Sequence, residues 1–402
     1  MNLFFEKEDL ISEIFTAVNT RAAISGITHT FYRYPARFSN LFARTMINLL
    51  TKPGDLVFDP YMGGGTSLVE ARLLGRRAIG IDVSSLATFI ARVKTTPLSD
   101  VDIAILAEWS ENLEKELNIR NSSNRPYEWI ENGYQRNLNR KRTWPIRKIL
   151  ELAITYIEKL PSESQRQFAR CVLLNTGQWA LDCRKEIPSS REFRKRLLYS
   201  FSEMIRGAKE FTLKARDADR LYDSKTSYRT LCLNRSVIGI ENDPLLSKES
   251  PNLIVTSPPY PGVYMLYHRW KVQGRWETPA PFWVANSMDG RGMSYYTLGD
   301  RKQKNLEDYF TNLQAAFMSL SSICKKNTWL VQMVGFSDPG WQLSRYLEIL
   351  CQCGFCEIKF RDHFDSLDGR IWRAVPSRKW YATYQDNTKN TAKEVVLFHK
   401  KV

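Results

Sequence analysis

The sequence predicts an α/β protein whose mostly parallel sheet is interrupted by a helical insertion. Short apolar runs alternate with helical patterns up to about residue 95, and the same alternation resumes near Ser236. Between these two parts the pattern changes to long polar helices with few strand signals. Alternating strands and helices favour a parallel sheet covered by helices. We therefore expect one interrupted domain, residues 1–95 and 236–402, and a helical insertion, residues 96–235.

The first strand, helix and strand enclose a glycine-rich turn. They are expected over residues 56–58, 67–74 and 78–81. Gly63, Gly64 and Gly65 allow positive φ and close backbone approach, and the helix that follows directs its amino terminus at a ligand. No lysine follows the glycines, so this is not a P-loop. Asp82 ends the next strand, where an acid in this fold class typically holds ribose hydroxyls. The turn and the acid together predict a site for an adenosine-containing cofactor.

A second apolar strand, over residues 253–255, ends abruptly in the letters SPPY. Pro258 and Pro259 cannot donate to a sheet ladder, so the strand must stop before them. Their rings also fix the backbone, which holds the Pro258 carbonyl and the Ser257 hydroxyl rigidly at the carboxyl edge of the sheet. Open α/β sheets bind their ligands at that edge. Further strands are expected near Ser236 and over residues 328–336, 355–360 and 394–400, with a helix over about 309–323.

The charge balance favours a polyanionic partner. The 402 residues include 58 Lys and Arg against 43 Asp and Glu, a net charge of +15. Such a surplus favours nucleic acid over a membrane, because no lipidation signal or basic amphipathic anchor is present. The amino terminus resembles neither a signal peptide nor a membrane helix, so we expect a cytoplasmic protein. The seven scattered cysteines favour free thiols, and no metal site is expected.

Taken together, these motifs resemble a known enzyme family. The letters DPYMGGGT resemble the glycine motif of S-adenosylmethionine-dependent DNA amino-methyltransferases, and TSPPY resembles their catalytic motif. The stretch YRYPARFSNLFARTMI looks like a third motif of that family. The resemblance covers about residues 25–95 and 236–402 and leaves the middle uncovered. It implies a Rossmann-like methyltransferase sheet, a restriction-modification or related defence role, and double-stranded DNA as the substrate.

The resemblance implies a role for each residue of the catalytic motif. An exocyclic amine conjugated to its ring is a poor nucleophile, so the enzyme must polarise it and align it with the methyl group. Ser257 and the Pro258 carbonyl would accept hydrogen bonds from the amine, and Pro259 would keep these acceptors rigid. Tyr260 would stack on the target base after base flipping. No covalent nucleophile is needed, so the cysteines are not expected to take part.

The resemblance also implies S-adenosylmethionine as the cofactor. Asp82 would bind the ribose, and Thr66 would cap the helix after the glycine turn. Asp243 falls where the family places an acid near the adenine, although the surrounding letters match loosely. Packing of Phe38 in the core is as consistent with the sequence as a contact with the methionine moiety. The full set of candidate cofactor residues is Arg37, Phe38, Asp59, Pro60, Gly63, Gly65, Thr66, Asp82 and Asp243.

The sequence departs from the family pattern at two positions, and the second of them bears on the choice of target base. Tyr61 replaces the usual phenylalanine, and Ser257 replaces aspartate or asparagine. A serine at this position accompanies cytosine N4 more often than adenine N6, so the sequence favours methylation of cytosine N4, with adenine N6 as the alternative. An RNA methyltransferase and a DNA-binding protein without turnover are the remaining alternatives. A cognate restriction endonuclease or other defence partner would fit the family.

Two segments are candidates for DNA contact. The basic and aromatic stretch over residues 120–148 would place Arg140, Lys141 and Arg142 on phosphates and would make the insertion a target-recognition region. A helical insertion with a purely structural purpose is the alternative. The second candidate is the segment after the catalytic motif, residues 267–304, with Arg269, Arg275 and Arg291. The recognised DNA sequence does not follow from these letters.

Overall fold

In the computed structural model, the described residues form one eight-stranded sheet and one separate hairpin. The residues described are 8–20, 22, 25–35, 38–123, 127–222, 228–262, 269–289, 298–300, 302–360, 368–375 and 392–402. The sheet contains β1 (Leu56–Asp59), β2 (Arg77–Asp82), β3 (Thr230–Asn234), β4 (Leu253–Thr256), β7 (Trp329–Gly335), β8 (Phe355–Ile358), β9 (Ile371–Val375) and β10 (Ala392–Lys401). The hairpin is β5 (Trp270–Val272) with β6 (Trp276–Thr278).

The strand order confirms a Rossmann-like, mostly parallel sheet. Neighbouring strands follow the order β3-β2-β1-β4-β7-β10-β8, and β9 pairs with β10. All pairs from β3 to β7 are parallel, whereas β10 runs antiparallel to β7, β8 and β9. The chain leaves β1 toward β3 and returns beside β1 as β4, so the connections diverge between β1 and β4. Ligands bind such sheets at the carboxyl ends of the strands at this switch point.

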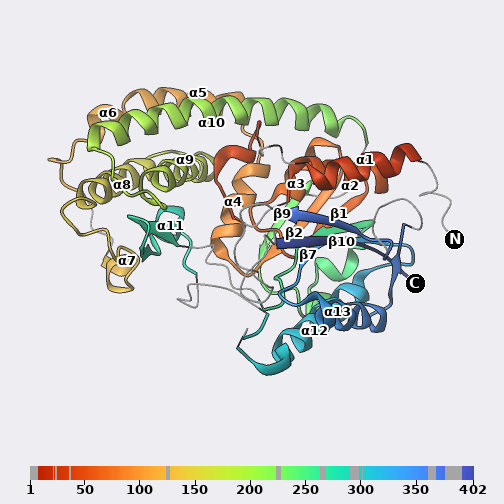
Figure 1. Cartoon of the computed structure of the whole chain (residues 1–402). Helices are drawn as coiled ribbons and strands as arrows, with labels where there is room; N and C mark the ends of the chain where they lie inside the picture. The colour runs from red at the N-terminus through yellow and green to blue at the C-terminus, as the bar shows by residue number, and fades with distance from the viewer. Residues whose placement is uncertain are drawn as a thin grey trace.

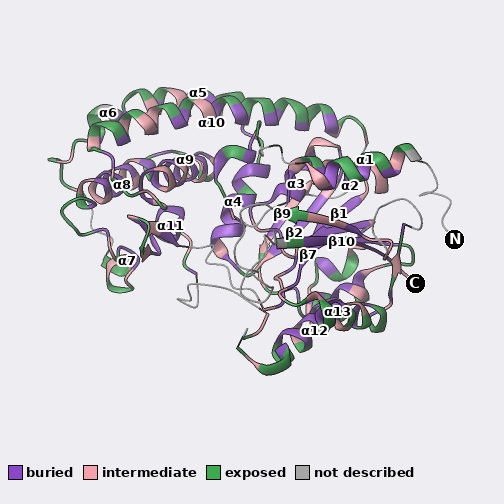
Figure 2. Ribbon diagram, in the orientation of Figure 1, coloured by how far each residue is buried: buried purple, intermediate pink, exposed green. Residues whose placement is uncertain are grey.

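Helices cover both faces of the sheet, which explains why its central strands β1 and β4 are buried throughout (Figure 2). On one face, Val57 and Val255 pack with side chains of α1 and α2. On the other face, Phe58 and Ile254 pack with α12 and α13. Successive side chains of a strand point to opposite faces, so both sets must be apolar. The helices of this domain are α1 (Glu8–Asn19), α2 (Asn40–Leu50), α3 (Thr66–Leu73), α4 (Ser85–Thr95), α12 (Glu307–Ile323) and α13 (Pro339–Gln352).

The prediction of a strand near Ser236 is wrong. Gly239 has a φ of +82°, and a short 3-10 helix, η3 (Ile240–Asn242), follows it. The strand is instead β3, which pairs with β2 and lies within residues 96–235, so the sheet resumes before the expected boundary. The remaining 3-10 helices are η2 (His29–Phe31), η4 (Leu246–Lys248) and η5 (Lys304–Leu306).

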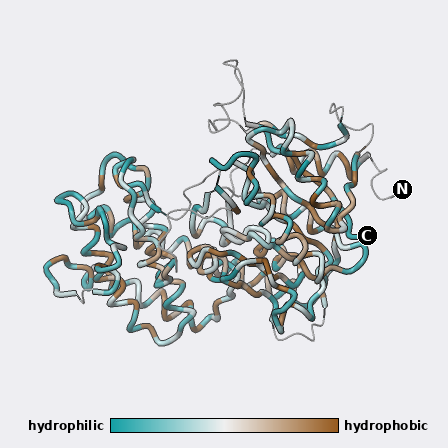
Figure 3. Tube along the Cα trace, turned by 90° about the horizontal axis from the view of Figure 1, so that it is seen from below, coloured by the Kyte–Doolittle hydropathy of each residue, from teal (hydrophilic) through white to brown (hydrophobic). Residues whose placement is uncertain are grey.

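A second lobe contains the helices between α4 and β3, and its core also includes side chains of α4 and of the segment around Tyr32. Its helices are α5 (Asp100–Glu111), α6 (Leu113–Glu116), α7 (Tyr127–Glu131), α8 (Trp144–Ile157), α9 (Glu163–Leu181) and α10 (Ser190–Asp219). The 30-residue α10 is about 45 Å long, and it runs along both lobes (Figure 1). Seen from below, the lobes lie side by side (Figure 3).

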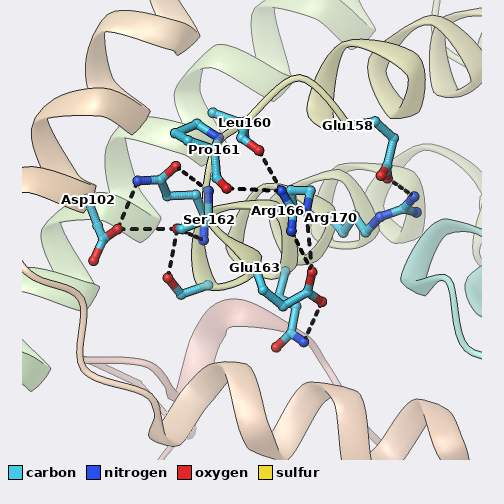
Figure 4. A network of polar contacts seen from close by, with 11 residues as sticks. Asp102, Glu158, Leu160, Pro161, Ser162, Glu163, Arg166 and Arg170 are labelled. Atoms are coloured by element: carbon cyan, nitrogen blue, oxygen red, sulfur yellow. Dashed lines mark hydrogen bonds and ion pairs between the residues drawn. The ribbon is translucent and has the colours of Figure 1, made fainter.

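This lobe also contains a segment that follows the catalytic motif in the chain. Trp270 on β5 and Phe282 on α11 (Ala280–Ala285) belong to the same core as α8 and α9. Arg170 of α9 donates to the carbonyl of Val284 at 2.8 Å and pairs with Glu158, as Figure 4 shows for the pair. The helical lobe is therefore built from two parts of the chain that lie on either side of β4. Among the described helices, none has both the length and the apolar character required to cross a membrane.

Candidate functional site

The glycine turn is tightly enclosed by its neighbours. Gly63 and Gly65 have φ values of +47° and +73°, which favour glycine. A Cβ on Gly64 would lie 2.8 Å from the Cβ of Tyr34, and one on Gly65 would lie 2.8 Å from the Cβ of Ala91. The backbone of the turn therefore follows a path that larger residues would obstruct. Gly65 itself is the N-cap of α3 and Thr66 is its first residue, so the expected capping role of Thr66 is wrong.

Asp59 joins the two motifs at the switch point. It is the last residue of β1, and its buried carboxylate accepts from the hydroxyl of Thr256 at 2.7 Å. The hydroxyl of Ser67 and, at 3.1 Å, the backbone N–H of Tyr61 donate to the same carboxylate. Burial raises the pKa of Asp59 to about 6, although these hydrogen bonds oppose the shift. Asp59 thus fixes the ends of β1 and β4 and, through Ser67, the first turn of α3. Pro60, the next residue, is buried.

Asp82 fixes the start of the glycine turn. One carboxylate oxygen accepts from the N–H of Gly63 at 3.0 Å, and the other accepts from the N–H of Ser84 at 2.8 Å. Burial raises the pKa of Asp82 to about 6. A carboxylate offers about four lone-pair positions, so these two bonds leave room for two hydroxyl donors. That capacity fits a ribose.

A buried hydroxyl adds to the fit for a cofactor. Tyr61 lies between β1 and the glycine turn in the chain, and its hydroxyl has no hydrogen-bond partner among the described residues. Burial raises the pKa of Tyr61, so this hydroxyl stays protonated and can donate. A narrow glycine cradle, two open acceptor positions on Asp82 and one open hydroxyl suit a polar molecule with a ribose. Within the described part of the chain, no group of three His, Cys, Asp or Glu side chains could hold a metal ion.

The segment before the glycine turn is anchored to it through buried polar contacts. The Lys94 ammonium of α4 donates to the Gly64 carbonyl at 3.0 Å and to the Tyr32 carbonyl at 3.4 Å. His29 and Glu70 of α3 form a buried contact at 2.7 Å. Phe38 is buried against Phe42, with ring centroids 5.4 Å apart, so it packs in the core. Arg37 lies outside the described residues, and its contact with the cofactor stays a prediction.

The polar atoms of the catalytic motif are held in defined directions. The Ser257 hydroxyl lies 2.9 Å from the carbonyl of Met333 on β7 and 3.3 Å from the hydroxyl of Tyr260. A carbonyl can only accept, so the hydroxyl hydrogen of Ser257 points at Met333 and the oxygen keeps lone pairs for a donor. The Pro259 carbonyl accepts from the Tyr309 hydroxyl at 2.7 Å. These bonds, together with the two proline rings, fix the backbone from Ser257 to Tyr260.

A buried carboxylate beside this motif was missed by reasoning from the sequence. The Tyr260 hydroxyl donates to Glu394 of β10 at 3.0 Å, and Arg373 of β9 pairs with the same carboxylate at 2.7 Å. Glu394 is only 1% exposed. The sequence offers one sign of this carboxylate, a single acid at the start of the apolar run EVVLFHK. An acid in that position is equally typical of an ordinary strand end.

Asp243 is engaged in local contacts. Its carboxylate accepts from the N–H groups of Leu245 and Leu246 at 2.9 and 3.3 Å and pairs with Arg235. Burial alone would raise its pKa, but these hydrogen bonds and the Arg235 charge lower it. The expected adenine contact of Asp243 stays a prediction.

The structure joins the two candidate DNA-contacting segments into one surface. The guanidinium carbons of Arg140 and Arg275 lie 3.4 and 4.2 Å from the ring centroid of Trp276 on β6. The Asn137 side chain donates to the Glu277 carbonyl at 2.8 Å, which ties the insertion to the hairpin. Arg140, Lys141, Arg142 and Arg275 are exposed.

Arg269 does not belong to this surface. Its side chain is 5% exposed and pairs with Asp289 at 2.9 Å, and Tyr134 donates to the same carboxylate at 2.6 Å. The guanidinium therefore stabilises the helical lobe and is not available to a phosphate. Arg291 lies outside the described residues.

Comparison with known proteins identifies similar sequences. Residues 5–91 match the family model described as DNA methylase. The chain is 37% identical over 75 residues to the Type II methyltransferase M.MvaI of Kocuria varians, covering 18% of this chain and 16% of that protein. It is 45% identical over 51 residues to a tRNA (guanine(10)-N2)-dimethyltransferase of Methanothermobacter thermautotrophicus, covering 12% and 15%.

A solved structure, TrmN from Thermus thermophilus, aligns with a TM-score of 0.33 and 9% identity over 92% of this chain and 50% of that chain. The sequence matches thus span less than a fifth of the length of either relative named above.

Proposed function

We propose that this protein is an S-adenosylmethionine-dependent methyltransferase that methylates an exocyclic amine in double-stranded DNA, because residues 5–91 match a family model described as DNA methylase and part of the chain is 37% identical to a Type II methyltransferase. The observation that carries the proposal is the hydrogen bond of 2.7 Å between Asp59 and Thr256, which lie 197 positions apart in the chain. This bond brings the glycine turn and the SPPY motif together at the switch point. A cofactor site and an amine-binding site therefore share one edge of the sheet.

The chain contributes binding, orientation and polarisation. Bound S-adenosylmethionine supplies an electrophilic methyl group on a sulfonium. Asp82 accepts from the ribose hydroxyls, and the glycine turn positions the methionine end. Ser257 and the Pro258 carbonyl accept the two N–H groups of the target amine, which directs the nitrogen lone pair at the methyl carbon. The nitrogen held by Ser257 and the Pro258 carbonyl would take up the methyl group that the cofactor supplies and would release one proton to water.

The favoured target is the N4 amino group of cytosine. Ser257 stands where many members of the family have Asp or Asn, and a serine there goes more often with cytosine. The hydroxyl hydrogen is directed at Met333, so Ser257 presents only acceptor positions to the amine. The same acceptor positions suit the N6 amino group of adenine, which is the alternative target. Analysis of the methylated nucleoside distinguishes the two bases.

The surface around Trp276 is the proposed DNA contact. Arg140, Lys141, Arg142 and Arg275 carry four exposed positive charges, and an aromatic ring supports two of them. Arginines on phosphates supply non-specific affinity. The protein would act in a restriction-modification or related defence system, as the name of the M.MvaI relative suggests, with a cognate endonuclease as its partner.

The deciding experiment measures methyl transfer from labelled S-adenosylmethionine to unmethylated DNA and, in parallel, to unmodified tRNA, followed by digestion to nucleosides. We expect label in N4-methylcytosine. Label in N6-methyladenine would support the class and correct the base. Label in tRNA but not in DNA would favour the activity named for the tRNA relative. No transfer to either would contradict the proposal, and Ser257→Ala with intact cofactor binding is the matched negative control.

A further inference from the structure

A chain of polar side chains leads from the catalytic motif into the sheet. Arg373 donates from Nε and Nη2 to the Glu394 Oε2 atom at 2.8 and 2.7 Å. The other oxygen, Oε1, accepts from the Tyr260 hydroxyl at 3.0 Å. The Ser257 hydroxyl lies 3.3 Å from that of Tyr260. Register explains the arrangement, because Glu394 lies opposite both Arg373 on β9 and Gly335 at the end of β7.

The chemistry of these groups sets the direction of the hydrogen bonds. An ionised carboxylate only accepts, so the Tyr260 hydrogen must point at Glu394 and away from Ser257. The Tyr260 oxygen then faces Ser257 as a second acceptor beside the Met333 carbonyl. Both neighbours of Ser257 can only take its hydrogen, and neither competes for its lone pairs. Those lone pairs are what the target amine requires.

We propose that Glu394 is a positioning residue for methyl transfer, which keeps the Ser257 oxygen open as an acceptor by holding the hydrogen of Tyr260. This inference rests on the proposed function, because it assumes that Ser257 binds the amine. It also gives the tyrosine hydroxyl a role that stacking of the ring alone does not require. Burying a carboxylate is costly unless it is paired, and Arg373 supplies the pair.

The test replaces one carboxylate oxygen of Glu394 by an NH2 group, which reverses the direction of the hydrogen bonds through Tyr260. In Glu394→Gln the amide oxygen is held by the two Arg373 donors, so the amide NH2 group faces Tyr260. The tyrosine must then accept from the amide, and its hydrogen turns toward Ser257, 3.3 Å away in the wild type. This blocks a lone pair that the amine needs. We expect kcat to fall at least about tenfold, as for the removal of a hydrogen bond to a polar group, with unchanged affinity for S-adenosylmethionine.

The second variant makes the test specific. Tyr260→Phe removes the hydroxyl hydrogen that Glu394→Gln turns toward Ser257 and leaves Ser257 directed at Met333, so this variant alone is the reference for the double variant. Adding Tyr260→Phe to Glu394→Gln should therefore restore kcat to the level of Tyr260→Phe alone. A merely structural role of Glu394 predicts no such rescue, because removing the tyrosine hydroxyl does not restore the carboxylate that pairs with Arg373. If Glu394→Gln does not fold, Glu394→Ala serves instead, because it too frees the tyrosine hydrogen and should be rescued by Tyr260→Phe.

The control is Glu357→Gln, which removes another Arg–Glu pair of the same sheet, that of Arg370 and Glu357 at 2.6 Å. It should leave kcat unchanged. If the wild type is active and Glu394→Gln has an unaltered kcat, or if the double variant is no faster than Glu394→Gln, the role of Glu394 is overturned and the proposed function stands. A wild type that transfers no methyl group to DNA would overturn the proposed function and this inference with it.

Discussion

Replacing Asp82 by alanine should weaken binding of S-adenosylmethionine by about 10- to 150-fold. The carboxylate uses two of its roughly four lone-pair positions on the N–H groups of Gly63 and Ser84. The remaining two would accept from the ribose. A hydrogen bond to a charged group contributes about 1.5–3 kcal/mol, and every 1.4 kcal/mol corresponds to about a tenfold change in Kd. The loss of only one of the two bonds already gives the stated range, which is therefore the smallest weakening that the ribose assignment predicts.

Isothermal titration calorimetry with S-adenosylmethionine measures this directly. Asp55→Ala is the matched control, because Asp55 also accepts one backbone N–H, that of Lys52 at 2.9 Å, but precedes β1 and so lies at the opposite edge of the sheet. It should leave Kd unchanged. A folded Asp82→Ala protein with wild-type affinity would refute the ribose assignment. Equal weakening in both variants would show that the effect is one of general stability.

Three further predictions concern pH, DNA and packing. The pKa of Asp82 is raised from an ordinary value of 3.8 to about 6, so between these values the folded state binds the proton more tightly than the unfolded state. The free energy of unfolding of the wild type should therefore fall relative to that of Asp82→Asn as pH rises from about 4 to about 6. Urea unfolding at several pH values that shows a constant difference would contradict this. Replacing Arg140 and Arg275 by glutamine should reduce the slope of log K for DNA binding against log salt concentration by about 0.9 for each phosphate that the protein no longer neutralises. Replacing the exposed Arg206 and Lys209 of α10 by glutamine should leave the slope unchanged. An unaltered slope in the Arg140 and Arg275 variant would place the DNA contact elsewhere. Gly177→Ala places a Cβ 2.5 Å from the ring of Trp270, so it should lower the free energy of unfolding by about 1–3 kcal/mol, despite the better helix propensity of alanine; a variant that unfolds at the wild-type temperature would show that the ring can move aside.

Local features of the fold could be predicted from the sequence, whereas its long-range pairings could not. The glycine turn with its flanking strands, and the strand that ends in SPPY, follow from short contiguous patterns of apolar residues, glycine and proline. The position of β3 could not be predicted, because the letters VIGI look more strand-like than TLCLN and only pairing with β2 decides between them. Where a segment is both short and buried, propensity is a weak guide.

The same limit applies to the site. Arg269 and Arg275 lie in one polar stretch of sequence, yet the first is buried by Asp289 and Tyr134 and the second lies against Trp276 at the surface. Tyr134 is distant from both arginines in the chain, so no local pattern could separate the two. Glu394 is likewise 134 residues from its partner Tyr260.

The helical lobe is not a module that can be exchanged by one cut. Its core draws Trp270, Phe282 and Trp283 from beyond β4 against α8 and α9, and the Trp270 indole donates to the Tyr32 hydroxyl in the segment before the glycine turn at 3.0 Å. A deletion or graft limited to residues 96–229 would strip the apolar partners from this returning segment and leave large aromatic rings in water. Any exchange of this lobe between relatives would therefore have to carry two separate pieces of chain, α5 to α10 and β5 to α11, around an unchanged β4. Recombination that exchanges single continuous segments would seldom achieve this, so the lobe and the sheet should be inherited together.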